Sequence, residues 1–260
     1  MESSDDVGRS EEEVGDGVTN KYLPESSRDR FNIETFGKIT QKLLTSGSCT
    51  SKEEYMPNRK DAFVQNGCYH IFNRGANREN IFVTDENYSF FLRLLHSHLR
   101  KTNIEVICYC LMPNHFHLLL LQTSDITIST LMHGFLSAYT QAFNKQQERT
   151  GTLFEGRYKH LAVKKPETLL RLMMYIHLNP VKAKLALRPE EWEFSDYRSW
   201  GETEKLPESS GDKFNLETFG KIQRWREEFM LPSSEEYKQY CLDYLNELED
   251  DKLLQKVMLE

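Results

Sequence analysis

The segment Pro113-Asn-His-Phe-His-Leu-Leu-Leu-Leu121 limits the possible folds of this chain more than any other. A turn signal at Pro113-Asn114 precedes a short run that ends in four leucines. This pattern predicts a strand over residues 115–121 whose apolar part is buried. Side chains on a strand point alternately to opposite faces, so His115 and His117 share one face and Phe116 lies on the other. Two imidazoles at this spacing can bind one divalent metal ion.

The residues on either side of this strand alternate between strand and helix patterns. We expect further strands over 67–73, 104–111 and 153–163, and helices over 85–101, 131–149 and 166–178, with Pro180 stopping the last helix. This order is the split βαβ, ferredoxin-like plan of an α+β protein with an antiparallel sheet and one added helix. In that plan the first strand is central and lies beside the strand that carries the two histidines.

Charge divides the chain into three regions. Residues 1–55 hold 7 basic and 12 acidic side chains, residues 56–205 hold 19 and 15, and residues 206–260 hold 7 and 13. All eight histidines fall in the middle region, which weakly favours a nucleic-acid-binding core between acidic ends. We therefore predict a largely disordered extension over 1–55, a functional domain over 56–200 and an acidic helical tail over 201–260.

An internal repeat flanks the predicted domain. Residues 24–39 and 207–222 are identical at thirteen of sixteen positions. Two copies are too few for a solenoid. The repeat is either a duplicated coding segment or a pair of equivalent docking peptides, and the sequence does not decide between them.

Cysteine usage and hydropathy favour a cytoplasmic protein. The five cysteines form no Cys-x-x-Cys pair, and an odd number without a secretory signal favours reduced thiols. The chain has no apolar run near the roughly 20 residues that span a bilayer. Its acidic first residues lack the features of a signal peptide.

The helix over 166–178 carries the candidate nucleophile, Tyr175. Asn179 follows four residues later, so the two side chains share a helix face about 6 Å apart. An amide oxygen from Asn179 could complete a metal site with His115 and His117, which would bring the metal close to the Tyr175 hydroxyl. Such a metal, Mg²⁺ or Mn²⁺, would orient a phosphate and favour the phenolate. His177 points away from Tyr175, either for packing or for a phosphate contact.

Two other tyrosines compete for the nucleophile role. Tyr139 has Phe135 four residues before it and Phe143 four residues after it, which favours core packing. Tyr158 lies in Gly156-Arg-Tyr-Lys159, a basic and aromatic cluster suited to stacking and phosphate contact, although a plain strand remains open.

Five motifs occur in an order that resembles a known family. They are Tyr69-His-Ile-Phe-Asn-Arg-Gly-Ala-Asn-Arg78, Met112-Pro-Asn-His-Phe-His117, Gly151-Thr-Leu-Phe-Glu-Gly-Arg-Tyr-Lys159, Tyr175-Ile-His-Leu-Asn-Pro180 and Trp192-Glu-Phe-Ser-Asp-Tyr-Arg-Ser199. Together they resemble the REP-associated tyrosine transposases, within the single-tyrosine HUH transposases of bacterial insertion sequences. The likeness spans about residues 56–200.

The resemblance implies a Mg²⁺- or Mn²⁺-dependent nuclease and strand transferase that acts on single-stranded DNA near hairpins. By position, His115 and His117 would be metal ligands, Asn179 a further ligand and Tyr175 the nucleophile. A cytoplasmic, nucleoid-associated monomer or homodimer without membrane contact is expected. Residues implied to contact DNA are Asn73, Arg74, Arg78, Arg157 and Lys159.

The chain departs from the family pattern at Glu155, where glutamine is common, and at Lys184, where glycine is common. Neither change touches the metal or nucleophile positions, but both bear on DNA affinity and target choice. Two other functions stay open: a catalytically silent protein that binds hairpin DNA on the same fold, and a metal hydrolase that uses water as the nucleophile.

Overall fold

The computed structural model describes residues 63–201 and 213–247. The expected disordered extension over 1–55 and the first copy of the repeat lie outside these residues. Residues 213–222 of the second copy form the first turns of helix α7 (Lys213–Glu228). The proposed division of the chain at residues 55 and 200 stays a prediction.

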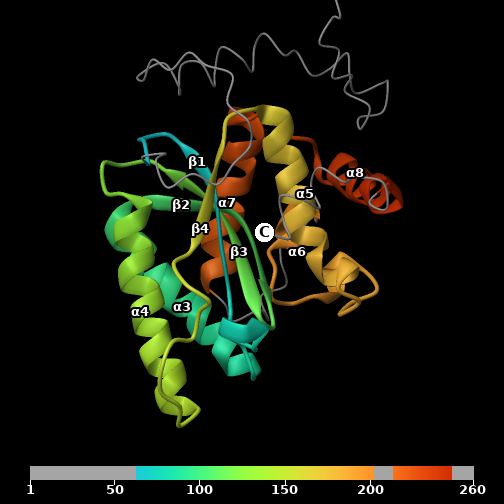
Figure 1. Ribbon diagram of the computed structural model, residues 1–260. Coiled ribbons are helices and arrows are strands. Elements are labelled where there is room, and N and C mark those ends of the chain that lie inside the picture. Colours follow the sequence, from blue (N-terminus) through green and yellow to red (C-terminus); the bar gives the residue numbers. More distant parts are fainter. Residues whose placement is uncertain (1–62, 202–212, 248–260) are drawn as a thin grey trace, which may run out of the picture. The chain divides into compact units, whose positions relative to one another are not determined.

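A four-stranded antiparallel sheet forms the centre of the described domain (Figure 1). Its strands are β1 (Cys68–Arg74), β2 (Ile104–Met112), β3 (His115–Gln122) and β4 (Lys159–Val163), in the spatial order β2-β3-β1-β4. This is the strand order of the split βαβ plan, so the predicted ferredoxin-like α+β class is confirmed. As predicted, β1 lies beside the strand of the two histidines, with Phe72 opposite His117 and Arg74 opposite His115.

One face of the sheet packs against helices α3 (Asp85–Thr102) and α4 (Ile128–Gln146). Phe116 on β3 meets Phe91 of α3 with ring centroids 5.3 Å apart, and Phe91 in turn meets Phe135 of α4 at 4.6 Å. Tyr139 is buried in this core, where its hydroxyl donates to the Ile81 carbonyl over 2.6 Å. The prediction that Tyr139 packs in the core is therefore confirmed.

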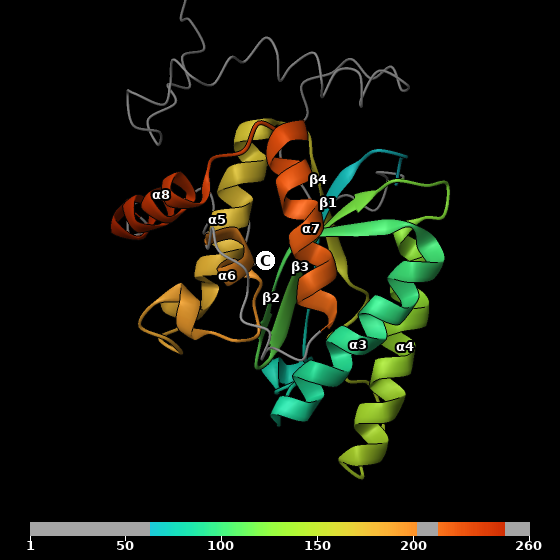
Figure 2. The ribbon, with the colours of Figure 1, turned by 180° about the vertical axis from the view of Figure 1, so that it is seen from behind.

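Helix α5 (Pro166–Lys182) covers the opposite face and contacts β2 and β4 (Figure 1). The short turn η1 (Ala76–Arg78) follows β1. After α5 come the short turn η2 (Pro189–Glu191) and helix α6 (Tyr197–Gly201). Figure 2 shows α7 running along the sheet and α8 (Ser234–Glu247) lying outside α5. Trp200 of α6 stacks on Trp225 of α7 at 6.3 Å, and both indoles are buried.

Three differences from the expected element boundaries have a local structural cause. Helix α4 begins at Ile128 because the Thr127 side chain caps it by accepting from the Thr130 amide. Strand β4 begins only at Lys159, because the chain before it follows the end of β1 as an irregular segment, with Glu155 N–H bonded to Arg74 O.

The third difference is at Pro180, which was expected to stop α5 but lies inside it. A proline has no amide proton, so it leaves the carbonyl four residues earlier without its helical donor. Here the Asn179 side-chain amide donates toward that carbonyl, on Ile176, at 3.5 Å and toward the Tyr175 carbonyl at 3.0 Å. The helix therefore continues to Lys182.

The four cysteines in the described residues (Cys68, Cys108, Cys110 and Cys241) are free thiols, and burial raises the pKa of each. For these four residues, this agrees with the expectation of reduced thiols. None of the helices in the described part of the chain is long and apolar enough to cross a membrane.

Candidate functional site

The two histidines of β3 open into a cavity of about 320 Å³ between the end of the sheet and α5. The cavity brings together His115, His117, Tyr175 and Asn179 from two elements that are distant in sequence. The full set of lining residues is Phe72, Asn73, Arg74, Arg78, Asn114, His115, His117, Glu155, Lys159, Tyr175 and Asn179.

Asn114 sets the tautomer of His115. The His115 Nδ1–H donates to Asn114 Oδ1 over 2.7 Å, and Asn114 Nδ2 donates to the Arg78 carbonyl over 3.2 Å. An imidazole that donates from Nδ1 has a bare Nε2, which is the form that binds a metal. The turn residue before β3 thus prepares His115 as a ligand.

His117 is held by a second imidazole, His70 of β1. His70 Nε2 and His117 Nδ1 lie 2.9 Å apart, and the two rings stack at 5.1 Å. The other ring nitrogen of His117, Nε2, is buried without a hydrogen-bond partner within the described residues. A buried polar atom without a partner costs free energy, so this nitrogen is suited to bind a group that the protein itself does not supply.

Burial keeps these imidazoles neutral. Desolvation lowers the pKa of His115 to about 4, with a smaller contribution from the charge of Arg74. Desolvation also lowers the pKa of His117 well below its usual value and that of His70 to about 3. Near neutral pH all three side chains are therefore available as lone-pair donors rather than cations.

Tyr175 reaches the same cavity from α5. Its ring meets the His117 ring edge-on, with centroids 5.8 Å apart. Burial raises the pKa of Tyr175 to about 12, an effect that hydrogen bonding to the Asn179 side chain partly offsets. The Lys182 ammonium lies 4.6 Å from the centre of the Tyr175 ring. Without further positive charge the phenol is a poor nucleophile near neutral pH.

The donor set fits a divalent cation. His115 and His117 each have an Nε2 without a described partner, and the amide nitrogen of Asn179 is engaged by its own helix, so its oxygen is the atom left for the cavity. Among the described residues, no three histidine, cysteine or carboxylate side chains gather in a metal-binding group. The candidate protein ligands in this cavity are therefore the two imidazoles and the amide oxygen of Asn179.

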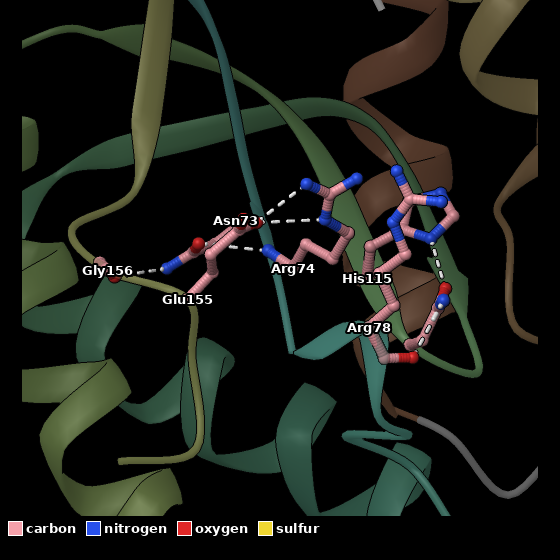
Figure 3. Close-up of polar contacts among 7 residues, drawn as sticks. Asn73, Arg74, Arg78, His115, Glu155 and Gly156 are labelled. Atoms are coloured by element: carbon pink, nitrogen blue, oxygen red, sulfur yellow. Dashed lines mark hydrogen bonds and ion pairs between the residues drawn. The ribbon is translucent and has the colours of Figure 1, made fainter. Parts of the chain in front are cut away.

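Cationic side chains surround the mouth of the cavity. Arg74, Arg78 and Lys159 line it together with a single acid, Glu155. Figure 3 shows Arg74 turned toward Glu155, whose Oε2 accepts from Arg74 Nε at 2.9 Å and from Nη2 at 2.7 Å. The hydrogen bonds from Arg74 lower the pKa of Glu155. Glu155 thus engages Nε and Nη2 of Arg74 and leaves Nη1 of the guanidinium for a phosphate.

The predicted DNA contacts divide between two surfaces. Asn73, Arg74, Arg78 and Lys159 line the cavity, whereas Arg157 lies outside it, in a groove beside α4. His177 points away from both. Its Nε2 donates to Asp196 over 2.9 Å and its Nδ1 bonds the Tyr237 hydroxyl over 2.6 Å, so it packs and makes no phosphate contact.

The sequence reasoning missed His70 and Phe72 as parts of the site. Both lie on the face of β1 that meets His117, where Phe72 stacks on His70 at 4.8 Å. Alternation along β1 could have placed the two on one face. Only the pairing register shows that this face abuts the histidines. Asn114 was recognised as a turn residue, but its bond to His115 was not foreseen.

Comparison with known proteins agrees with the resemblance. The family model described as "Transposase IS200 like" matches residues 63–179. A candidate REP-associated tyrosine transposase of Haemophilus influenzae is 25% identical over 181 residues, which cover 64% of this chain and all of that protein.

Two solved structures also align with the chain. A REP-associated tyrosine transposase bound to a REP hairpin aligns with a TM-score of 0.49 at 18% identity, over 62% of this chain and 93% of that one. A candidate transposase from Deinococcus radiodurans aligns with a TM-score of 0.34 at 22% identity, over 46% of this chain and 95% of that one.

Proposed function

We propose that the protein cuts and rejoins single-stranded DNA beside hairpins, a proposal supported by the match of residues 63–179 to the model of the IS200-like transposases. It would do so as a metal-dependent endonuclease and strand transferase with a tyrosine nucleophile. The observation that carries this proposal is the edge-on contact of Tyr175 with His117 inside one cavity. A silent DNA-binding protein would not need a phenol beside two neutral imidazoles.

His115, His117 and Asn179 would hold Mg²⁺ or Mn²⁺. When bound, the ion supplies positive charge that orients the scissile phosphate and lowers the pKa of the phenol. The chain's own residues supply the remainder: Asn114 and His70 hold the imidazoles in place, and α5 holds Tyr175. Arg74, Arg78 and Lys159 offer charge to the DNA backbone.

In the proposed step, Tyr175 Oη forms a bond to phosphorus and the bond from phosphorus to the 3′ oxygen breaks. The phenol gives up its proton, and the leaving 3′ oxygen takes one, so that the products are a 5′-phosphotyrosine and a free 3′-hydroxyl. A 3′-hydroxyl from another strand can reverse the step, because the covalent bond keeps the energy of the phosphodiester. Strand transfer then needs no nucleotide cofactor.

Two alternatives predict different products. A silent hairpin-binding protein would leave the DNA intact, and a metal hydrolase with a water nucleophile would cut it without a covalent adduct. The test is to incubate the full chain with Mn²⁺ and a single-stranded hairpin labelled at its 3′ end, followed by denaturing electrophoresis. We expect the label to migrate with the protein, and a 5′ label to appear on a free fragment.

Tyr175→Phe should abolish the adduct, whereas Tyr158→Phe, which removes the phenol of the rival tyrosine, should leave it. EDTA should prevent adduct formation, and His115→Ala should bind the hairpin without cutting it. An adduct that persists in Tyr175→Phe would show that the nucleophile is assigned wrongly. Cutting without any adduct would instead support the water-based hydrolase.

A further inference from the structure

A second and larger hollow, the α4 groove, lies beside the cavity of the proposed site. It has a volume of about 830 Å³, within the range of pockets that enclose small-molecule ligands. Residues from β1, from α4 and from the segment before β4 line it: Asn73, Ser129, Thr130, Met132, His133, Leu136, Ser137, Thr140, Gln141, Phe154, Gly156, Arg157 and Tyr158. None of these lining residues, all within the described part of the chain, is acidic.

The chemistry of the α4 groove combines an apolar floor with a polar rim. Met132, Leu136 and Phe154 are largely buried at its base, while exposed His133 and Ser137 lie along the α4 side. Tyr158 stands on the opposite side. Its hydroxyl and the Ser129 hydroxyl lie within hydrogen-bond distance of each other at 3.0 Å, which fixes the phenol across the groove.

The segment over residues 154–159 separates the two hollows. Glu155 and Lys159 line the cavity of the proposed site, whereas Phe154, Gly156, Arg157 and Tyr158 line the α4 groove. Asn73 lines both. Figure 3 shows its side chain reaching Gly156, where Asn73 Nδ2 donates to the Gly156 carbonyl over 3.0 Å. The groove therefore adjoins the proposed catalytic cavity at the end of β1.

We infer that the α4 groove binds unpaired nucleotides of the DNA strand that passes through the catalytic cavity, with a base stacked against Tyr158 over the apolar floor that includes Phe154 and a phosphate on Arg157. This inference rests on the proposed function for the identity of the strand. An aromatic ring and an apolar floor receive base faces, and a guanidinium with no acid among the described residues that line its groove receives backbone charge. A duplex keeps its base faces stacked on one another, so it lacks the surface that this groove fits.

The test measures equilibrium binding of a short, unstructured, fluorescein-labelled DNA strand to the full chain in EDTA, so that no cutting occurs. Ser137→Trp places a large side chain into the groove from an exposed position on α4, and we expect about tenfold weaker binding, the effect of losing one stacked base. Ser97→Trp, at an exposed position on α3 outside the groove, is the matched control and should bind as the wild type does.

Three further variants examine the stacking and the charge. Tyr158→Phe keeps the ring and should retain affinity, whereas Tyr158→Leu keeps apolar packing without the aromatic face and should bind about tenfold more weakly. Arg157→Gln should reduce the slope of log affinity against log salt by about 0.7, the value for one contact to a single strand. A strand that carries 5-iodouracil should crosslink to Tyr158 on irradiation.

Unchanged binding in Ser137→Trp, or equal binding by Tyr158→Leu and Tyr158→Phe, would overturn the inference, as would a blunt duplex that competes as well as the single strand. These outcomes do not depend on cleavage. If the groove variants lose binding but the wild type forms no covalent adduct with Mn²⁺, the groove assignment stands and the nuclease proposal fails. If the adduct forms while the groove variants bind normally, the nuclease proposal stands and the groove assignment fails.

Discussion

Burial of His115 and His117 predicts that the proposed metal site keeps its affinity at mildly acidic pH. A metal binds the neutral imidazole, and an ordinary histidine loses this form below a pH of about 6.5. Burial lowers the pKa of His115 to about 4 and that of His117 still further. We therefore expect Mn²⁺ affinity to stay nearly constant from pH 8 to about pH 5 and to fall only below that. Mn²⁺ electron paramagnetic resonance titrations at a series of pH values would measure it.

The control for this prediction is the same titration in His115→Ala, which should bind Mn²⁺ weakly at every pH. A tenfold loss of wild-type affinity for each unit of pH below 6.5 would mean that one of the imidazoles titrates as an exposed histidine. The buried environment that the structure gives them would then be wrong.

His70 is expected to act on the metal through His117. To bind through its free Nε2, His117 must carry its proton on Nδ1 and donate it to His70 Nε2, 2.9 Å away. His70→Phe removes this acceptor while it keeps an aromatic ring between Phe72 and His117. Loss of a partner that orients a metal ligand typically costs about 10- to 100-fold in metal affinity. Mn²⁺ titration should show a loss of this size, whereas thermal unfolding should show a folded protein.

His70→Gln is the matched variant, because a glutamine amide can present an oxygen acceptor near the position of Nε2. It should recover part of the lost affinity. Equal Mn²⁺ binding by the wild type and His70→Phe would show that the contact between the two imidazoles is only packing.

At the scale of elements, a buried hydrogen-bond network around Asp196 holds α5 against the sheet on the side away from the cavity. Asp196 Oδ1 accepts from the Tyr109 amide of β2 at 2.7 Å and from His177 of α5 at 2.9 Å. Asp196→Ala would leave both donors buried without a partner, and we expect a loss of about 3 kcal/mol in the free energy of unfolding. Asp196→Asn keeps an oxygen acceptor and should lose about 1 kcal/mol. Urea denaturation would measure both.

The control is Asp125→Ala, because Asp125 is exposed and surface changes usually stay within about 0.5 kcal/mol. If Asp196→Ala unfolds at the same urea concentration as Asp125→Ala, the network does not seat α5. A lower yield of the Tyr175 adduct in Asp196→Asn at full folding would indicate that the position of the helix matters for the chemistry as well.

The order of the elements could be predicted from the sequence, and their exact ends could not. Periodicity and turn residues were sufficient for the strand order and for the shared face of His115 and His117, because both follow from local alternation. Pro180 misled the prediction, since its effect on α5 depends on the Asn179 side chain taking over a carbonyl. The predicted start of β4 was wrong because the residues before Lys159 pair with the end of β1 only through an isolated bridge between Gly75 and Phe154 and do not extend the ladder of β1 and β4.

The candidate site was partly predictable for the same physical reason. His115, His117, Tyr175 and Asn179 carry chemistry in their own residue types and spacing. The role of His70 depends on the register between β1 and β3, which places it next to His117. The position of Arg157 beside α4 rather than in the cavity depends on the path of an irregular segment, and no local pattern sets that path.

At the scale of the whole molecule, the described domain supplies every proposed catalytic group from one polypeptide. α5 reaches the sheet of its own chain, so the contact between Tyr175 and His117 is made within that chain. Consequently, a mixture of His115→Ala and Tyr175→Phe proteins should form no adduct, because neither molecule contains a complete set. Denaturing electrophoresis of the mixture with the 3′-labelled hairpin would test this. Recovered adduct would indicate exchange of α5 between molecules.

The same geometry has a consequence for heredity. If each molecule works alone, loss-of-function alleles at the histidines and at the tyrosine would fall into a single complementation group, and a cell that carries one of each would remain null. A defective protein would also not inhibit an intact one, so such alleles would be recessive.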